Sequence, residues 1–311
     1  MPEPSPLSLR SQPSLPLSGV LVVDKPAGIT SHDVVAVARR ALNERSIGHT
    51  GTLDPMATGV LPLAIGKATR LVRFLTASDK DYDAVIRFGR ATDTYDATGT
   101  TTSESPQRPT RTALEIGLLA LSGAYDQMPP PYSAKKVGGH RAYKMARRDE
   151  PVELKPVSVT VSRAVLTAFD DDTASVSLTC SSGFYVRSFA HELGRRLGCG
   201  ACLESLRRTR SGTSTLIGAV TLEEVSAPGA AEALAGRLVP SHALLPDFAL
   251  VQVNEQGLAY LSNGRDLGPA QCTGPLRAAS PWVRLADANG SLVALAEPTA
   301  TGLLHPSIVL L

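Results

Sequence analysis

The loop from Gly48 to Gly59, GHTGTLDPMATG, contains one carboxylate whose direction is restricted by its neighbour in the chain. Pro55 disfavours the helical conformation at Asp54 and favours an extended backbone, which points the aspartate side chain along a fixed direction. An Asp-Pro pair also commonly begins a turn, and on these residues alone that simpler interpretation stays open. No second carboxylate lies close by in the sequence, so this loop alone does not supply the acid and base pair of a glycosidase.

Two stretches of the chain are rich in basic residues and poor in acids. Residues 195–210 contain five arginines and a single acid, Glu204. Residues 132–148, YSAKKVGGHRAYKMARR, contain no acid, and their basic side chains are Lys135, Lys136, Arg141, Lys144, Arg147 and Arg148. Either stretch alone is most simply a solvated face. The two together favour a polyanionic partner about as strongly as they favour a solvated surface.

The composition is typical of a globular protein with two domains. The chain has 311 residues, 43% hydrophobic and 19% charged, and roughly 150 residues is usual for one domain. Residues 1–246 hold 28 basic and 24 acidic residues, or +4, while residues 247–311 hold three and five, or −2. Apolar runs stay far below the ~18 residues of a membrane span. Residues 1–18 lack the pattern of a secretion signal and are expected to form a disordered tail.

The four cysteines are too few for a disulfide framework in a chain of this size. We therefore expect reduced thiols and a cytoplasmic location. Cys199 and Cys202 form a C-x-x-C pair, but zinc would require a second pair or a histidine pair nearby. Buried or idle thiols are favoured over a metal or redox role.

Hydrophobic spacing predicts the elements that must position the Asp54 loop. Residues 19–23 form a buried strand, a helix capped by Ser31 runs to Asn43, and residues 82–88 alternate as a strand. Residues 98–112 predict a loop and residues 114–121 a helix. Residues 157–180 predict a hairpin, and a helix starts at Arg187 where its second strand ends. Beyond a boundary near Pro246, the short apolar alternations predict a small β-rich domain.

Five blocks of the sequence resemble one family in its own order. They are GVLVVDKPAGITSHD, GHTGTLDPMATGVLPLAIGKATR, SDKDYDAVIRFGRATDTYDATG, PPPYSAKKVGGHRAYKMAR and SSGFYVRSFAHELGRRLGCGACLESLRRTRSG, which together cover most of residues 19–212. They resemble the TruB-type pseudouridine synthases, which isomerise uridine 55 in the T-loop of transfer RNA. The C-terminal end is less distinctly similar to the family's PUA domain.

The resemblance implies an α/β (α+β) fold. Its core is a mixed, mostly antiparallel sheet flanked by helices, formed by residues 19–246 with an inserted basic RNA-binding arm at residues 124–152. Residues 247–311 would then be a small PUA-like β domain that also binds RNA.

The resemblance also implies the catalytic residues. Asp54 matches the catalytic aspartate, which either attacks the sugar carbon that bears the base or takes a sugar proton to give a glycal. Tyr82 matches the tyrosine that stacks on the target base and serves in removing the C5 proton. Arg187 matches the arginine that pairs with the aspartate, holding it ionised and oriented.

Further positions have less specific implied roles. Lys25, Leu206 and Tyr185 match residues lining the same pocket, and His49 matches a histidine that contacts the T-loop as the base leaves the stack. Asp93, Thr94 and Asp96 fit a pattern expected to form a structural turn. The arm residues expected to contact RNA are Lys135, Lys136, Arg141 and Arg148.

The implied reaction is an isomerisation in which no electrons are gained and no group is imported, so no cofactor and no metal are expected. The implied partner is the T-arm of transfer RNA, bound by a monomer without a guide RNA or a membrane. Two alternatives stay open. One is an RNA-guided synthase. The sequence shows no long lysine-rich tail, which argues against this alternative. The other is an RNA-folding helper whose catalysis is incidental.

Overall fold

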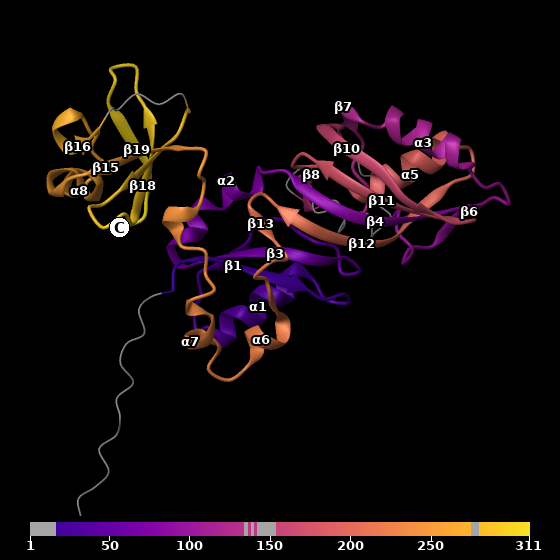
Figure 1. Ribbon diagram of the computed structural model, residues 1–311, viewed down its shortest axis with the longest axis horizontal. Coiled ribbons are helices and arrows are strands. Elements are labelled where there is room, and N and C mark those ends of the chain that lie inside the picture. Colours follow the sequence, from indigo (N-terminus) through magenta and orange to yellow (C-terminus); the bar gives the residue numbers. More distant parts are fainter. Residues whose placement is uncertain (1–16, 134–135, 138–139, 142–153, 275–279) are drawn as a thin grey trace, which may run out of the picture.

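The computed structural model describes residues 17–133, 136–137, 140–141, 154–274 and 280–311. Within these residues the chain forms a ten-stranded mixed sheet followed by a five-stranded sheet (Figure 1). This confirms the α/β core and the small β domain. The domain boundaries themselves stay a prediction, and most of the expected tail and much of the expected arm lie outside the described residues.

The large sheet is mostly antiparallel, with parallel pairing at two of its junctions, β1 with β14 and β3 with β12. Its strands, in spatial order, are β14 (Val220–Thr221), β1 (Gly19–Lys25), β3 (Thr58–Ile65), β12 (Ala201–Ser211), β4 (Lys80–Phe88), β11 (Thr173–Cys180), β10 (Val157–Phe169) and β7 (Gly123–Gln127). In addition, β2 (Ile47–His49) pairs with β3, and β13 (Ser214–Thr215) pairs with β12.

Helices cover one face of this sheet, and short helical elements cover part of the other face, so that β1 is buried on both sides. Leu21 and Val23 of β1 share one apolar cluster with α1, α3, α5, α6 and α7, while Val20 and Val22 pack against η1 and α2 on the other face. The helical elements of this part are α1 (Ser31–Ala41), η1 (Gly66–Leu71), α2 (Val72–Thr76), α3 (Arg111–Ala120), α5 (Val186–Arg196), α6 (Leu222–Ser226), α7 (Ala230–Ala235) and η2 (Ser241–Ala243).

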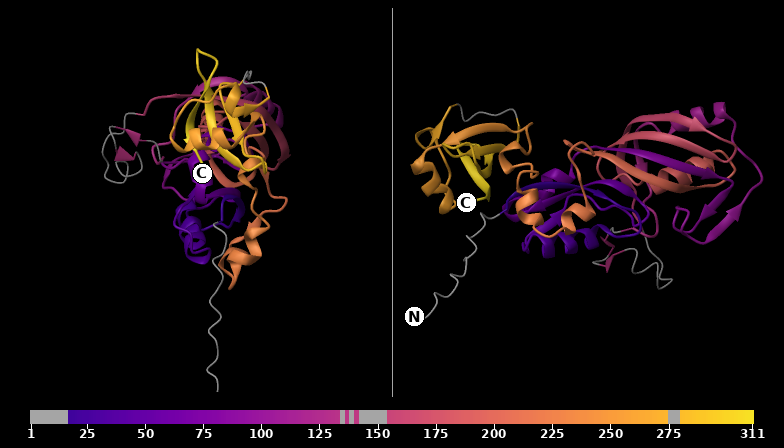
Figure 2. Two further views of the ribbon diagram at one scale, coloured as in Figure 1. Left: turned by 90° about the vertical axis from the view of Figure 1, so that its left-hand side faces the viewer. Right: turned by 60° about the horizontal axis from the view of Figure 1, so that its bottom comes forward.

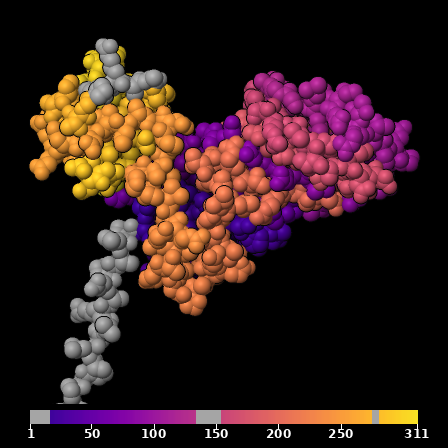
Figure 3. Space-filling model, in the orientation of Figure 1, coloured from indigo at the N-terminus to yellow at the C-terminus, as the bar shows by residue number. Residues whose placement is uncertain are grey.

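The C-terminal sheet packs against the α2 side of the core. The ring of Phe74 lies 4.8 Å from that of Trp282 and 5.7 Å from that of Phe248, and Arg70 Nη1 donates to the carbonyl oxygen of Val309. Figures 2 and 3 show this sheet as a separate lobe at one end of the molecule. Its elements are β15 (Ala249–Val253), α8 (Glu255–Ser262), η3 (Pro269–Gln271), β16 (Cys272–Thr273), β17 (Val283–Ala286), β18 (Leu292–Pro298) and β19 (Leu304–Val309).

Two local predictions need correction. The first helix is capped by Thr30 rather than Ser31, because the Thr30 side chain accepts from the amide of Asp33 and the Asp33 carboxylate accepts from the amide of Thr30. The predicted loop at residues 98–112 contains a strand, β6 (Thr101–Glu104), which pairs with β5 (Arg90–Thr92). All four residues of β6 are exposed, so the alternation that marks a half-buried strand is missing from its sequence.

Two short strands remain, β8 (Lys136–Val137) and β9 (His140–Arg141), and they pair with each other. Among the described residues, no helix has the length and apolar character needed to cross a membrane.

Candidate active site

A cavity of about 1210 Å³ opens between the Asp54 loop, β4, β12 and the start of α5. The elements that meet there are far apart in the sequence, so only the folded sheet brings their side chains together. Six of the site residues expected from the sequence line its wall: His49, Asp54, Tyr82, Tyr185, Arg187 and Leu206.

Asp54 and Arg187 form a two-point ion pair in this cavity. Arg187 Nε lies 2.9 Å from Asp54 Oδ2, and Arg187 Nη2 donates to Asp54 Oδ1 at 3.0 Å. The arginine side chain is 7% exposed and the aspartate side chain 34%. A guanidinium that faces a carboxylate with two parallel bonds fixes the orientation of that carboxylate. The pair therefore holds the Asp54 carboxylate in one orientation in the cavity wall.

Arg187 is held from several directions at the first turn of α5. Its Nη1 donates to the carbonyl oxygen of Thr94 at 3.0 Å and its Nη2 to that of Tyr132 at 3.0 Å. The Asp96 carboxylate lies 3.7 Å from Nη1. These contacts leave the guanidinium a single orientation, the one that faces Asp54.

The segment around Asp96 is the structural turn that the sequence predicts. One oxygen of Asp96 accepts from the Thr94 hydroxyl at 2.8 Å and from the amide and hydroxyl of Thr98 at 3.0 and 2.6 Å. Asp93 accepts from the amide of Thr100 at 2.7 Å. This turn presents the Thr94 carbonyl oxygen and the Asp96 carboxylate to Arg187, and its residues form part of the cavity wall.

The Asp54 loop is fixed from below by α1 and the end of β1. Ser31 Oγ accepts from the amide of Leu53 at 2.9 Å, and the amide of Gly28 donates to the carbonyl oxygen of Pro55 at 2.8 Å. Lys25 Nζ donates to the Pro55 carbonyl oxygen at 3.3 Å and also to two carbonyl oxygens of its own turn, those of Pro26 and Ile29.

Lys25 therefore lies beneath the loop, and it is not among the residues that line the cavity. The side chain is fully buried, and burial lowers the pKa of Lys25 to about 8. Its donors are occupied by backbone carbonyl oxygens, which keep the Asp54 loop in position.

Tyr82 and Leu206 enter the cavity from the neighbouring strands β4 and β12. Both are buried, and burial raises the pKa of the Tyr82 phenol. Gly59, where the Asp54 loop joins β3, has φ +101°, and a Cβ there would lie 2.2 Å from the Arg208 carbonyl oxygen. Glycine is therefore required for β3 to approach β12 at the base of the site.

His49 and Tyr185 form further parts of the wall. The His49 ring packs edge-on against His32 with centroids 5.2 Å apart, and burial lowers its pKa to about 4. It is therefore a neutral ring suited to apolar or stacking contact. Tyr185 is held at its backbone by Gln127, whose side chain bonds to both its amide and its carbonyl oxygen at 2.8 and 3.0 Å.

Two cavity residues, Lys80 and Arg208, were not singled out from the sequence as site residues. Lys80 precedes the Tyr82 motif, and Arg208 was grouped with the basic stretch at residues 195–210. Both are almost fully buried and both line the cavity. The signal that could have found Arg208 is its spacing of two residues from the buried Leu206 in a strand, which places both side chains on the same face.

The other arginines of that basic stretch are paired with carboxylates at the surface. Arg195 and Arg196 both bond to Glu192, Arg207 to Asp24 and Arg210 to Asp81, with shortest distances of 2.7–2.8 Å. This stretch therefore offers less free positive charge than its sequence suggests.

All four cysteines are free and buried, and burial raises the pKa of the Cys180 thiol to about 12. In the described part of the chain, no three His, Cys, Asp or Glu side chains gather as metal ligands would.

The fold as a whole is similar to that of chains in solved Nop10–Cbf5 complexes. Over 95% of this chain, it matches a chain of an archaeal box H/ACA Nop10–Cbf5 complex with a TM-score of 0.70 at 22% identity, covering 86% of that chain. A Cbf5–Nop10–Gar1 complex gives a TM-score of 0.71 at 24% identity, with 95% and 85% covered. At these identities, the similarity establishes the fold alone.

Sequence comparison narrows the class to one family. The family model described as "TruB family pseudouridylate synthase (N terminal domain)" matches residues 39–186, and "tRNA pseudouridylate synthase B C-terminal domain" matches residues 187–246. The tRNA pseudouridine synthase B of Solibacter usitatus is 46% identical over 94% of this chain and 100% of its own length. That of Thermobifida fusca is 42% identical over 94% and 98%. The chain therefore belongs to the TruB family of pseudouridylate synthases.

Proposed function

We propose that this protein isomerises uridine 55 in the T-loop of transfer RNA to pseudouridine. The observation that carries the proposal is the Asp54–Arg187 ion pair, which lies in a cavity large enough for a nucleotide in a chain of the TruB family. The relatives that support transfer RNA as the substrate are named tRNA pseudouridine synthase B and align over almost the whole chain.

Asp54 acts at the anomeric carbon of the target sugar, either as nucleophile or as the base that produces a glycal. Its partly exposed carboxylate faces the cavity while Arg187 holds its other side, as either role requires. Arg187 is a positioning residue, because its bonds run to Asp54 and to backbone oxygens.

Tyr82 stacks on the displaced base and takes part in removing the C5 proton. A uridine inside a folded T-loop is not accessible to Asp54, so the base must first leave the stack. The neutral His49 ring, Tyr185 and Leu206 supply apolar surface for the nucleotide in the cavity.

The enzyme recognises the T-arm directly, as a monomer and without a guide RNA. The arm residues Lys135, Lys136, Arg141 and Arg148 contact phosphates. Lys136 lies in β8 and Arg141 in β9, and the other two lie outside the described residues. The four buried, free cysteines support a cytoplasmic setting.

The test is incubation of the full chain with unmodified transfer RNA, followed by mapping of pseudouridine in the product. We expect modification at position 55 only. A transcript with cytidine at position 55 should stay unmodified. Asp54→Asn should bind the RNA with near-normal affinity and lose turnover, since the amide keeps the shape but is neither nucleophile nor base. Modification elsewhere, or turnover of Asp54→Asn within tenfold of the unaltered enzyme, would contradict the proposal.

A further inference from the structure

Arg208 is a buried cation in the cavity wall that forms no ion pair with a carboxylate of the described residues. The residue is 1% exposed. Its Nε donates to the carbonyl oxygen of Val60 at 2.7 Å and its Nη2 to that of Gly51 at 3.0 Å. These oxygens accept two of the five guanidinium N–H groups and carry no net charge. None of the ion pairs found among the described residues includes Arg208.

The two carboxylates in the wall do not compensate Arg208, because both approach Arg187. Asp54 lies 2.9 Å and Asp96 3.7 Å from the Arg187 guanidinium. Lys80, the remaining cation of the wall, donates to the carbonyl oxygens of Thr76 and Ser78. The cavity wall therefore carries an excess of positive charge on the β4 and β12 side.

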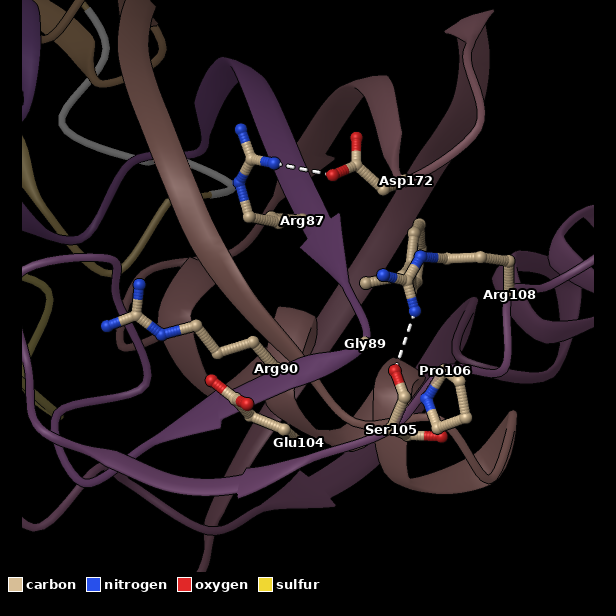
Figure 4. A pocket seen from close by; sticks show the side chains of 9 residues that line it. Arg87, Gly89, Arg90, Glu104, Ser105, Pro106, Arg108 and Asp172 are labelled. Atoms are coloured by element: carbon tan, nitrogen blue, oxygen red, sulfur yellow. Dashed lines mark hydrogen bonds and ion pairs between the residues drawn. The ribbon is translucent and has the colours of Figure 1, made fainter.

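Arg87, on the neighbouring strand β4, gives a comparison with Arg208, because its guanidinium has carboxylate partners. It lies at the far end of the strand, where Asp172 approaches its guanidinium at 2.6 Å (Figure 4). Glu204 approaches the same guanidinium at 2.8 Å. Burial of a charge without such a partner costs several kcal/mol in general. The uncompensated burial of Arg208 is therefore the kind of cost that a site bears for a negative charge that appears during the reaction.

The charge of Arg208 affects the pKa values of four residues in and beneath the cavity wall. The pKa values of Lys25 and Lys80 are lowered to about 8 and that of His49 to about 4, mainly by burial, and the charge of Arg208 contributes to each of these shifts. Burial raises the pKa of Tyr82, and Arg208 opposes that shift. Tyr82 and Arg208 are directly opposed in the pairing of β4 with β12, so the Arg208 charge lies next to the ring on which the base would stack.

We propose that Arg208 supplies the positive charge that stabilises the uracil anion while the base is detached from the sugar. This inference rests on the proposed function. When the C1′–N1 bond breaks, both of its electrons remain on uracil, and the charge spreads by conjugation over N1, O2, C5 and O4. The base later bonds to C1′ through C5, as the Asp54 ester bond breaks in one route or as the proton returns from Asp54 to C2′ in the other. The C5 proton then leaves.

The need for a second positive charge does not depend on the route. If Asp54 attacks C1′, an oxygen–carbon bond replaces the bond to N1. If Asp54 instead takes the C2′ proton, a C1′=C2′ double bond forms and the carboxylate becomes a carboxylic acid. In both routes Asp54 loses its negative charge and uracil gains it. Arg187 faces the group that becomes neutral, whereas Arg208 is beside Tyr82, where the base becomes anionic.

The test compares two transfer RNAs that differ only at position 55, one with uridine and one with 5-fluorouridine. Fluorine stabilises the departing anion within the base itself, so the enzyme's contribution should matter less. Disappearance of the N1-linked nucleoside is followed by nuclease digestion and mass spectrometry, in single turnover with saturating enzyme. Arg208→Gln should slow cleavage of the uridine substrate by roughly 10²–10³-fold, the scale of losing one preorganised group. With 5-fluorouridine, the loss should be at least tenfold smaller.

Arg87→Gln is the matched control and should stay within about twofold of the unaltered enzyme on both substrates. An equal loss for Arg208→Gln on both substrates would overturn the proposal, because it would show that Arg208 only supports the loop through Val60 and Gly51. If Arg208→Gln does not fold, Arg208→Lys decides, since lysine keeps the charge but cannot make both bonds. A lower Tm with a rate within about tenfold of normal supports the charge role, and a large equal loss on both substrates refutes it. Failure of the unaltered enzyme to convert uridine 55 would instead refute the proposed function.

Discussion

The arginines around the cavity differ from those on the outer surface in their partners. Arg207 and Arg210 each face a carboxylate at 2.7 Å, and Arg195 and Arg196 share Glu192. In the cavity, by contrast, Arg187 is buried against a single catalytic candidate, Asp54, and Arg208 has no acidic partner among the described residues. The same residue type therefore serves two purposes within a few positions of one strand.

The free-energy cost of losing a charge differs between the surface arginines and the cavity arginines. An exposed ion pair typically contributes 0 to about 1 kcal/mol, so losing one has little effect. Removing one partner of a buried pair typically costs about 3–5 kcal/mol, because the other charge is left in a poorly solvated place. Substitutions at the cavity should therefore affect turnover strongly, whereas equivalent substitutions at the surface should not.

The largest difference in single-turnover rate is expected between substitutions of Arg187 and of Arg87. Arg187→Met leaves Asp54 without its counter-ion and its fixed orientation, and should lower the single-turnover rate by about 10³-fold, on the scale of a broken buried pair. Arg87→Met, at the far end of β4, should leave the rate within about twofold. A normal rate for Arg187→Met would mean that the ion pair is not the reacting site.

A smaller effect is expected at Tyr82, which contributes both a ring and a hydroxyl. Tyr82→Phe keeps the stacking surface but loses the hydroxyl, so RNA binding should persist while the rate falls by about 10²-fold, within the usual range for acid–base groups. Tyr125→Phe, a partly buried tyrosine outside the cavity wall, is the control. Retained turnover in Tyr82→Phe would restrict Tyr82 to stacking.

The inserted arm and the second basic stretch should differ in RNA binding. Replacing the arm residues by glutamine should reduce the slope of log affinity against log salt by about 0.7–0.9 for each phosphate that the arm no longer neutralises. The arm variant changes Lys135, Lys136, Arg141 and Arg148. The matched variant changes Arg195, Arg196, Arg207 and Arg210, whose charges are already paired, and should alter the slope much less. A larger reduction in the matched variant would place the RNA-binding surface on β12 and α5.

The sequence predicted the elements that carry strong local signals. The run at residues 19–23, the hairpin at residues 157–180 and the helix near Arg187 all occur as expected, because buried strands and amphipathic helices show in hydrophobic spacing. The exposed strand β6 was missed because an exposed strand has no such spacing. The sequence does not distinguish Ser31 from Thr30 as the helix cap, because both are good capping residues, and only the folded loop shows that Ser31 bonds to Leu53.

The catalytic candidates came from the family resemblance, and their geometry could not have come from spacing. Asp54 and Arg187 are 133 residues apart, and only the pairing of strands from distant segments brings them within bonding distance. Arg208 shows the reverse case, in which residues close in the sequence lie in different surroundings in the fold. Its neighbours Arg207 and Arg210 are surface residues, so the sequence grouped all three, and only burial in the fold separates the cavity arginine from the others.

The smallest expected effect concerns the pH dependence of the free energy of unfolding, which should differ between a lysine in the cavity and a lysine on the surface. Burial lowers the pKa of Lys80 from 10.5 to about 8, so between these pH values the unfolded chain holds a proton that the folded chain has released. The free energy of unfolding should therefore rise with pH in this range. Lys80→Met should lack this rise, falling behind the unaltered protein by on the order of 1 kcal/mol between pH 7 and pH 9 in urea unfolding. Lys67→Met, which removes an exposed lysine, should follow the unaltered protein in parallel. Parallel curves for Lys80→Met as well would show that the Lys80 ammonium titrates normally and that the cavity does not disfavour added positive charge.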